Sequence, residues 1–193
     1  LHAVHYPVRR GELLNLVVIV EGPAPEDLTQ WDHAANALQL ARALQGSCAA
    51  LRDVVGSVEA SGGQWRLWPL SDRAPLTGPQ GMARGLVGLI GDAAHPMRPY
   101  LAQGAGMAIE DAAELQRALA MADLDVSTRL RRYALNRWQR NARVQARSIR
   151  NGEIFHATGP MRWGRDSALR LLGSRLMDVP WLYRGDGACA TGW

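Results

Sequence analysis

The chain has 193 residues, which suffice for one sizeable domain or for parts of two. Hydrophobic residues make up 47% of the sequence and charged residues 21%, so a buried core is expected and intrinsic disorder is not. The net charge is +4, and no apolar run approaches the roughly 20 residues that cross a bilayer, which argues against a membrane-spanning helix.

The first segment predicts a β-hairpin. His2, Val4 and Tyr6 alternate with their neighbours as on two faces of a strand, and residues 13–20 are apolar and β-branched enough for a second strand. Arg9-Arg10-Gly11 supplies the turn between them. We expect helix over most of residues 26–58, with a break at Gly46-Ser47, and one further strand at 65–70.

A Gly/Pro-rich link at residues 75–81 is the best domain boundary in the sequence. After it, residues 85–90 predict a short buried strand, residues 91–103 a loop, and residues 104–122 a helix. Asp125-Val126-Ser127 can cap a second helix that runs to about residue 150, and a last helix is expected at residues 163–177.

Arginines are crowded between Arg129 and Arg150. A basic helix of this kind can bind nucleic acid or an acidic membrane. Alternatively, the arginine stems pack on the protein itself and their charged ends meet carboxylates or solvent. We favour this second interpretation and expect no nucleic-acid or membrane partner, because aromatic residues are sparse there and no nucleic-acid motif accompanies the charge.

The two cysteines, Cys48 and Cys189, lie far apart and have no metal-ligand residues beside them. Free thiols in a reducing cytoplasm are the simplest interpretation, and no secretory leader follows Leu1. The sequence does not begin with Met and opens inside a strand-like pattern, so we also expect a fragment of a longer chain.

Residues 85–112, which combine strand, tight loop and helix start, are the most informative part of the sequence. Gly91 at the end of a strand lets the backbone approach a ligand closely, and Asp92 offers an acceptor for sugar or polyol hydroxyls. The helix opened by Gly104-Ala105-Gly106 presents unpaired N–H groups and a positive dipole end, which attract an anion such as a reduced flavin.

The residues alone leave ordinary explanations open for this segment. Asp92 can simply cap a turn, and His95 can be a loop histidine without a role. Glu110 and Asp111 are adjacent on a helix and point about 100° apart, so they cannot converge on one atom as an acid–base pair. We interpret both as carboxylates that position the helix.

The sequence GDAAHPMRPYLAQGAGMAIEDA, at 91–112, resembles the second FAD-binding motif of the flavoprotein aromatic hydroxylases. The segment from Trp68 to Leu76 resembles the family's W-x-L-x-D-R-x-P-L pattern, and the one from His2 to Asn15 resembles the strand pair of the salicylate-hydroxylase type. Residues 147–160 and Trp181-Leu182-Tyr183 resemble the tail of that type, so the resemblance covers almost the whole sequence.

The resemblance implies a set of cofactor-binding positions. Asp92 would bind the ribityl chain of FAD, with Gly91 and Ala93 alongside. Pro96 would lie near the isoalloxazine ring. The pyrimidine edge of the ring would meet the helix start, at Gly104, Ala105 and Gly106.

The resemblance also implies substrate-binding and catalytic positions. Gln103 would face the substrate, and His2 and Tyr6 would line an aromatic pocket from one face of their strand. We expect His2 to accept the phenolic proton, because an unperturbed histidine titrates near pH 6.5 and can act as a base at neutral pH.

The fold class implied is mixed α/β (α+β): part of an FAD/NAD(P)-binding domain of the p-hydroxybenzoate hydroxylase type, antiparallel substrate-domain strands, and C-terminal helices. The domains would be residues 1–78 (substrate-binding), 79–150 (FAD-binding) and 151–193 (helical tail). The reaction implied is hydroxylation of a phenolic or hydroxybenzoate-like ring with FAD, NADH or NADPH, and O2.

The Gly-rich dinucleotide fingerprint with which these hydroxylases begin does not occur in the sequence. We therefore expect the chain alone to bind FAD weakly or not at all, and to form a homodimer or associate with the missing N-terminal half. The alternative to an enzyme is a non-catalytic fragment or scaffold of the same family.

Overall fold

The computed structural model describes residues 1–24, 26–29, 33–34, 37–173 and 179–183. The chain divides into two compact units, Leu1–Leu70 and Ser71–Trp193. The division falls N-terminal to the Gly/Pro-rich link at 75–81. All strand pairs among the described residues are antiparallel and two-stranded, so the mixed helix and antiparallel-strand class is confirmed.

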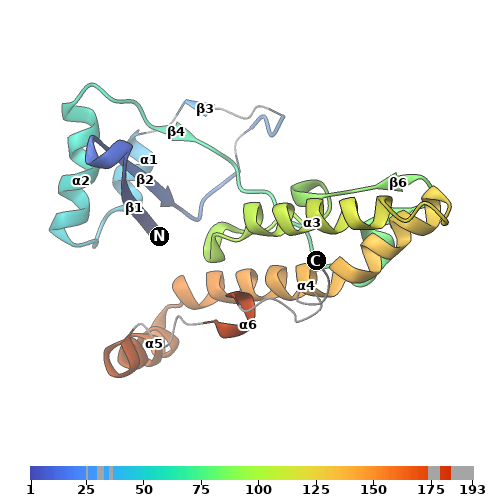
Figure 1. Ribbon diagram of the computed structural model, residues 1–193. Coiled ribbons are helices and arrows are strands. Elements are labelled where there is room, and N and C mark those ends of the chain that lie inside the picture. The colour runs from blue at the N-terminus through green and yellow to red at the C-terminus, as the bar shows by residue number, and fades with distance from the viewer. Residues whose placement is uncertain (25, 30–32, 35–36, 174–178, 184–193) are drawn as a thin grey trace. The chain divides into compact units, whose positions relative to one another are not determined.

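The first unit begins with the expected hairpin (Figure 1). Strand β1 (His2–Val8) pairs with β2 (Leu13–Ile19), in a register that runs from His2↔Ile19 to Val8↔Leu13. The short helix η1 (Arg9–Gly11) makes the turn, and all three of its residues have positive φ angles, of 48°, 59° and 94°. Only the last of these is a glycine, so the turn places two arginines in a backbone region that glycine favours.

The rest of the first unit departs in part from the expected helix over 26–58. Helices α1 (Ala37–Ala43) and α2 (Ala49–Ala60) are separated near the predicted break, and Gly46 there has φ +79°. Upstream, however, the chain forms the short strand β3 (His33–Ala34), which pairs with β4 (Arg66–Leu67). The expectation of helix from residue 26 was wrong, because pairing with a distant strand outweighs the local helical pattern there.

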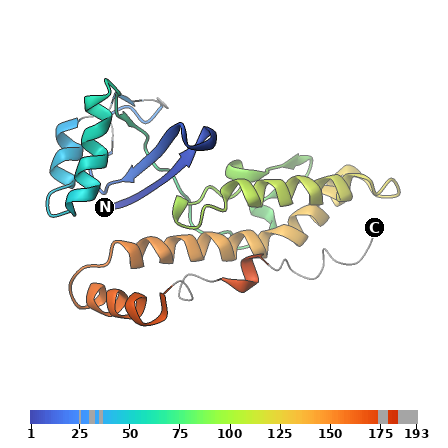
Figure 2. The same cartoon turned by 60° about the vertical axis from the view of Figure 1, so that its left-hand side comes forward.

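The second unit is built on two antiparallel helices that lie side by side in both views (Figures 1 and 2). Helix α3 (Gly104–Leu119) packs against α4 (Val126–Phe155), which Asp125 caps by accepting a hydrogen bond from the Thr128 N–H. Both helices and the cap were predicted. The chain continues through α5 (Gly159–Leu172) and α6 (Pro180–Tyr183); α5 begins earlier than predicted, and the expected end at 177 lies outside the described residues.

Short elements lead from the domain division to α3. They are η2 (Pro79–Gly81), the strands β5 (Ala83–Arg84) and β6 (Val87–Gly88), then η3 (Gly91–Ala93) and η4 (Pro99–Leu101). The buried strand expected at 85–90 was wrong. Gly85 is a turn residue with φ +56° between β5 and β6, and the side chains of Leu86 and Val87 are 76% and 63% exposed. The apolar run suits a strand covered by further strands, and the described residues supply none.

Two buried clusters hold the second unit together. One contains Leu76, Met82, Ala94, Ala118, Tyr133 and Ala134. The other contains Met107, Val144, Val179 and Leu182, and the partly buried Met97, Leu101 and Trp181 pack against it. The two clusters therefore join the 91–103 loop to both long helices and to the segment at 179–183. Among the described helices, none is both long and apolar enough to cross a membrane.

A glycine in α4 tests how closely this loop packs on the helix. A methyl group added at Gly152 would lie 2.6 Å from the Tyr100 ring, whereas one added at Gly164 in α5 would meet nothing within 4 Å. We expect Gly152→Ala to destabilise the fold by about 1–3 kcal/mol through overpacking, despite the higher helix propensity of alanine. Gly164→Ala should stabilise by about 0.5–1 kcal/mol. Urea unfolding followed by circular dichroism measures both; a stabilised Gly152→Ala variant would contradict the packing.

Candidate functional site

The turn at Gly91 is shaped by the requirements of its backbone. Gly91 has φ +59°, and a Cβ atom added there would lie 3.2 Å from Cβ of Ala108 in α3. A side chain at this position would meet both backbone strain and a close neighbour. The residue is buried, and its N–H donates to Oδ2 of Asp111 over 3.2 Å. The turn is therefore fixed to α3 from the inside.

Asp111 is a fully buried carboxylate that accepts hydrogen bonds from four donors. Oδ2 accepts from the Gly91 N–H and lies 2.6 Å from Nε2 of His95. Oδ1 accepts from Nε of Arg137 over 2.8 Å and from Nδ2 of Asn141 over 3.0 Å. These donors come from the loop and from α4, so a single side chain of α3 ties three segments together.

The charges around Asp111 are balanced inside the protein. Burial alone would raise the pKa of Asp111, but hydrogen bonds from His95, Asn141 and Arg137 lower it to about 2. Its neighbour Glu110 contacts Nη1 of Arg137 and Nε of Arg140, each over 2.7 Å. The pKa of Glu110 is likewise lowered, since these hydrogen bonds outweigh the effect of its partial burial. Two carboxylates thus face two guanidinium groups.

Both carboxylates position helices, as predicted. They accept hydrogen bonds from different nitrogens of the same guanidinium group, that of Arg137. His95, to which no role could be assigned from the sequence, is fully buried and contacts Asp111. Because Asp111 is an acceptor, we place the imidazole proton on Nε2. Its Nδ1 has no hydrogen-bond partner among the described residues.

Asp92, next to the buried Gly91, is exposed, and its carboxylate makes no hydrogen bond within the described part of the chain. It faces the start of α3: a Cβ atom added at Gly104 would lie 3.8 Å from Oδ1 of Asp92. The first turn of α3 contains no acidic residue, and Gln103 at its N-cap makes no capping hydrogen bond with its side chain. A carboxylate and an uncapped helix start therefore lie side by side.

The remaining predicted residues of the loop and the helix start differ in exposure. Ala93 and Ala105 are exposed, and Pro96, Gln103 and Gly106 are half-buried. Oε1 of Gln103 would lie 3.2 Å from a Cβ atom added at Gly106, so this side chain folds back over the first turn of α3. A larger residue at position 106 would displace it.

His2 and Tyr6 belong to the first unit, on β1. Their separation of four residues places them on one face of the strand, where Tyr6 is 50% exposed and His2 is half-buried. The loop at 91–103 belongs to the second unit. The combination of His2 and Tyr6 with the loop in one site therefore remains a prediction.

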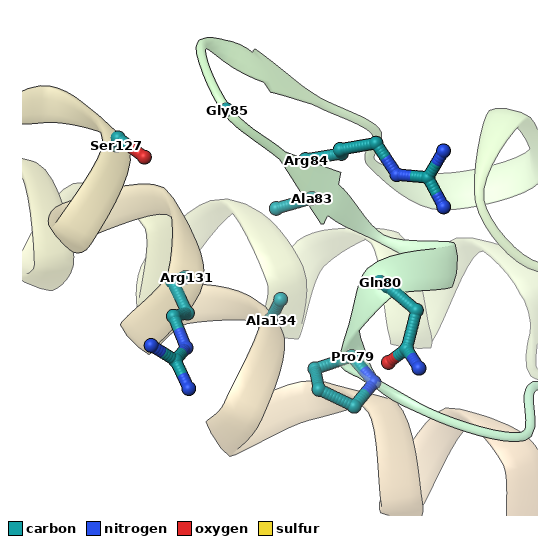
Figure 3. Close-up of a pocket in the computed structure, with 8 residues that line it drawn as sticks. All are labelled: Pro79, Gln80, Ala83, Arg84, Gly85, Ser127, Arg131 and Ala134. Atoms are coloured by element: carbon teal, nitrogen blue, oxygen red, sulfur yellow. The ribbon is translucent and has the colours of Figure 1, made fainter.

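One pocket of the second unit has none of the predicted site residues in its lining. It has a volume of about 290 Å³ and is lined by parts of η2, the β5–β6 turn and α4. Figure 3 shows the side chains of Arg84 and Arg131 extending in different directions from it, and no carboxylate or histidine lines it. It lacks the convergent polar groups of a ligand site.

Most of the arginines described between 129 and 150 serve the protein's own structure. The Arg129 guanidinium donates to the carbonyls of Leu124, Leu119 and Ala122, and Arg143 stacks over the Trp181 ring at 3.9 Å. Arg140 donates to the carbonyl of Leu182 as well as to Glu110. These contacts match the second interpretation of the basic helix.

Comparison with known proteins relates the chain to flavin-binding proteins. Residues 58–148 match the FAD binding domain family. A 3-amino-4-hydroxybenzoate 2-monooxygenase from Streptomyces platensis is 36% identical over 97% of the chain, and a 3-hydroxybenzoate 6-hydroxylase from Polaromonas naphthalenivorans is 35% identical over 94% of it. The chain is a relative of the flavoprotein aromatic hydroxylases. The resemblance stated from the sequence is thereby confirmed.

A solved structure extends this relationship to three dimensions. A salicylate hydroxylase substrate complex matches 97% of the chain with a TM-score of 0.74 and 27% sequence identity. The chain spans less than half of each of these hydroxylases: 45% and 44% of the two sequence relatives, and 46% of the chain in the solved structure.

The Asp111 contacts predict a specific dependence on pH. The pKa of Asp111 in the folded chain is about 2, below the ordinary value of 3.8, so its contribution to stability is complete above pH 3.8 and is lost as the pH falls toward 2. We expect Asp111→Asn to cost about 3–5 kcal/mol at neutral pH, because Arg137 and the donors of the loop lose a buried charge. The variant should also lack the wild-type fall in stability below pH 3.8 that this group causes.

Urea unfolding between pH 2 and 7 measures both effects. The exposed Asp123→Asn variant, in the turn between α3 and α4, is the control and should behave as the wild type. If Asp111→Asn lowers the free energy of unfolding no more than the control variant does, the carboxylate does not hold the loop.

Proposed function

We propose that this chain supplies one half of the flavin site and part of the substrate pocket of an FAD-dependent monooxygenase. The reaction is hydroxylation of a phenolic or hydroxybenzoate-like ring with NADH or NADPH and O2. The proposal depends on the adjacency of the Asp92 carboxylate and the Gly104 helix start. The family match at 58–148 and the hydroxybenzoate monooxygenases among the relatives support it.

The residues present fit a flavin. The Asp92 carboxylate is exposed and has acceptor positions for the hydroxyls of a ribityl chain, the buried Gly91 fixes the turn that carries it, and the exposed Ala93 adds only a methyl group beside it. The first turn of α3 offers N–H groups and the positive end of a sixteen-residue helix to the anionic pyrimidine edge of a reduced flavin. FAD, when bound, supplies the chemistry that activates O2.

The chain's own residues orient the substrate and handle its proton. Gln103, folded over the first turn of α3, presents its amide at the border of the flavin half-site. His2 accepts the phenolic proton at its imidazole, which makes the ring more electron-rich, and Tyr6 lines the aromatic pocket from the same strand face. The half-buried Pro96 adds an apolar surface beside the isoalloxazine ring of the flavin.

A second candidate is a non-catalytic member of the family. The observation that favours it is that the half-site residues account for the ribityl chain and the pyrimidine edge alone, and these 193 residues contain no Gly-rich dinucleotide fingerprint. The contacts of the FAD pyrophosphate and adenine then have to come from another polypeptide segment. Without that segment the chain would retain little flavin.

Flavin binding tests the proposal. The chain would be co-expressed with the part of the Polaromonas naphthalenivorans hydroxylase that it does not cover, and the FAD dissociation constant of the complex measured by quenching of flavin fluorescence. We expect Asp92→Ala to weaken binding by about ten- to a hundredfold, since a charged hydrogen bond to a hydroxyl is worth about 1.5–3 kcal/mol. Gly104→Val should do the same by obstructing the helix start.

Asp123→Ala is the control, because it removes an exposed carboxylate in the same unit. The chain alone should be colourless after purification. A stoichiometrically yellow chain would disprove the half-site, and unchanged affinity of the complex after both Asp92→Ala and Gly104→Val would disprove the assignment of the cofactor residues.

A further inference from the structure

The loop that carries the proposed cofactor residues is held through the carbonyl group of every second residue, each of which accepts a hydrogen bond from a side chain. The Ala94 carbonyl accepts from Nη1 of Arg73 over 3.0 Å. Each second residue that follows has its carbonyl bound by a side chain of α4: Pro96 by Gln145, Arg98 by Ser148, and Tyr100 by Asn151. One edge of the loop backbone therefore faces the helix throughout this stretch.

The three α4 residues form a regular set, which we call the carbonyl clamp (Gln145, Ser148 and Asn151). They are spaced three residues apart, so they lie along one face of the helix. Their exposures are 1%, 0% and 6%. Each step of three residues along the helix matches a step of two along the loop, so helix and loop run in the same direction. The pairing depends on register, because a shift of the loop by one residue would turn these carbonyls away from α4.

Gln145 differs from the other two because both ends of its amide are used. Nε2 donates to the Pro96 carbonyl over 3.2 Å, and Oε1 accepts from the Leu76 N–H over 3.1 Å. Leu76 and Arg73 both lie in the segment that directly follows the division between the two units. Gln145 thus connects that segment to the loop through two backbone groups.

Apolar side chains would fill the same buried space without the cost of desolvating an amide or a hydroxyl. The polar groups instead define where the backbone of the loop runs, since a buried donor that loses its acceptor is destabilising. The loop between Gly91 and Gln103 contains most of the proposed flavin contacts. Its path is consequently fixed before any ligand binds.

We propose that the carbonyl clamp is a set of positioning residues for the cofactor half-site, with Gln145 as its principal member. The inference rests on the proposed function, because the loop is the one assigned to FAD. The clamp acts through backbone carbonyls and not by contact with the cofactor. A clamp residue should therefore control the order of the loop in the chain itself, and flavin affinity only as a consequence.

Amide hydrogen exchange on the 193-residue chain measures the first effect. The Ala94 and His95 N–H groups donate to the Gly91 carbonyl, and the Ala102 N–H donates to that of Pro99, so three loop amides report on its order. In Gln145→Leu we expect these amides to exchange about tenfold faster, corresponding to the loss of a buried hydrogen bond. Amides of the β1–β2 hairpin in the first unit should not change.

Gln145→Glu separates the two ends of the side chain. It keeps an acceptor for the Leu76 N–H but places a second oxygen against the Pro96 carbonyl, so the loop amides should exchange faster while the Leu76 amide keeps its protection. Gln139→Leu and Gln139→Glu, at an exposed position of the same helix, are the matched controls and should have no effect. If Gln145→Leu does not fold, Ser148→Ala removes only a hydroxyl and should accelerate the Ala102 amide.

Two results would overturn the inference. One is unchanged exchange of the loop amides in Gln145→Leu or, where that variant does not fold, in Ser148→Ala. The other is an equal acceleration of every protected amide in the second unit, which would make Gln145 a general stabilising residue. Failure of the proposed function is distinguishable, because Asp92→Ala would then leave FAD affinity intact while Gln145→Leu still loosened the loop. Faster exchange in Gln145→Leu without weaker FAD binding in the co-expressed complex would refute the link to the cofactor.

Discussion

The buried carboxylate of Asp111 is the interaction on which the rest of the second unit depends. Its four donors come from the Gly91 turn, the following histidine and two positions of α4. A charged group in this environment is stable only when its partners compensate the loss of water. The turn, α3 and α4 therefore have to assemble together. The hydrogen bonds that compensate the buried carboxylate also determine the geometry of the loop.

Neighbouring residues of the loop differ in whether their polar groups bind inside the protein or are exposed to solvent. The N–H of Gly91 donates to Asp111 inside the protein, and the next residue, Asp92, has an exposed carboxylate without a hydrogen-bond partner in the part of the chain that the structure describes. The same division holds on α3, where Asp111 is buried and the first turn at Gly104 is open to a ligand. An inner layer of satisfied polar groups thus supports an outer layer of exposed ones, and in the proposed half-site this arrangement would preorganise the outer layer for a ligand.

Features set by local chemistry could be predicted from the sequence. The hairpin follows from alternation and a turn, the start of α4 follows from the Asp125 cap, and the loop followed by α3 follows from the glycine-rich segment at 91–106. The β3–β4 pair and the exposure of Leu86 could not be predicted, because both depend on which strands are available as partners. A β-branched run indicates a strand but not whether other strands cover it.

The support of the loop was missed for a related reason. The two α4 side chains that donate to Asp111 are 26 and 30 residues away from it in sequence, and the clamp side chains are about 50 residues away from the loop carbonyls that they bind, so no local pattern connects them. A signal was nevertheless present in α4 itself. Tyr133, Arg137, Asn141 and Gln145 follow one another at four-residue spacing, and a polar stripe of this kind inside a helix indicates a buried network and not a surface for nucleic acid.

The positions of these groups also determine which properties of the protein can vary independently. Asp92 is exposed and its carboxylate makes no hydrogen bond among the described residues, so a change there should have little effect on the fold and, in the proposed half-site, should alter the affinity for a ligand. Asp111 and Gln145 are buried and bind backbone groups of the same loop, so changes there alter the loop first and the ligand second. If the proposed half-site is correct, ligand specificity can diverge through the exposed layer while the buried layer is retained, because the fold depends on the contacts of the buried layer.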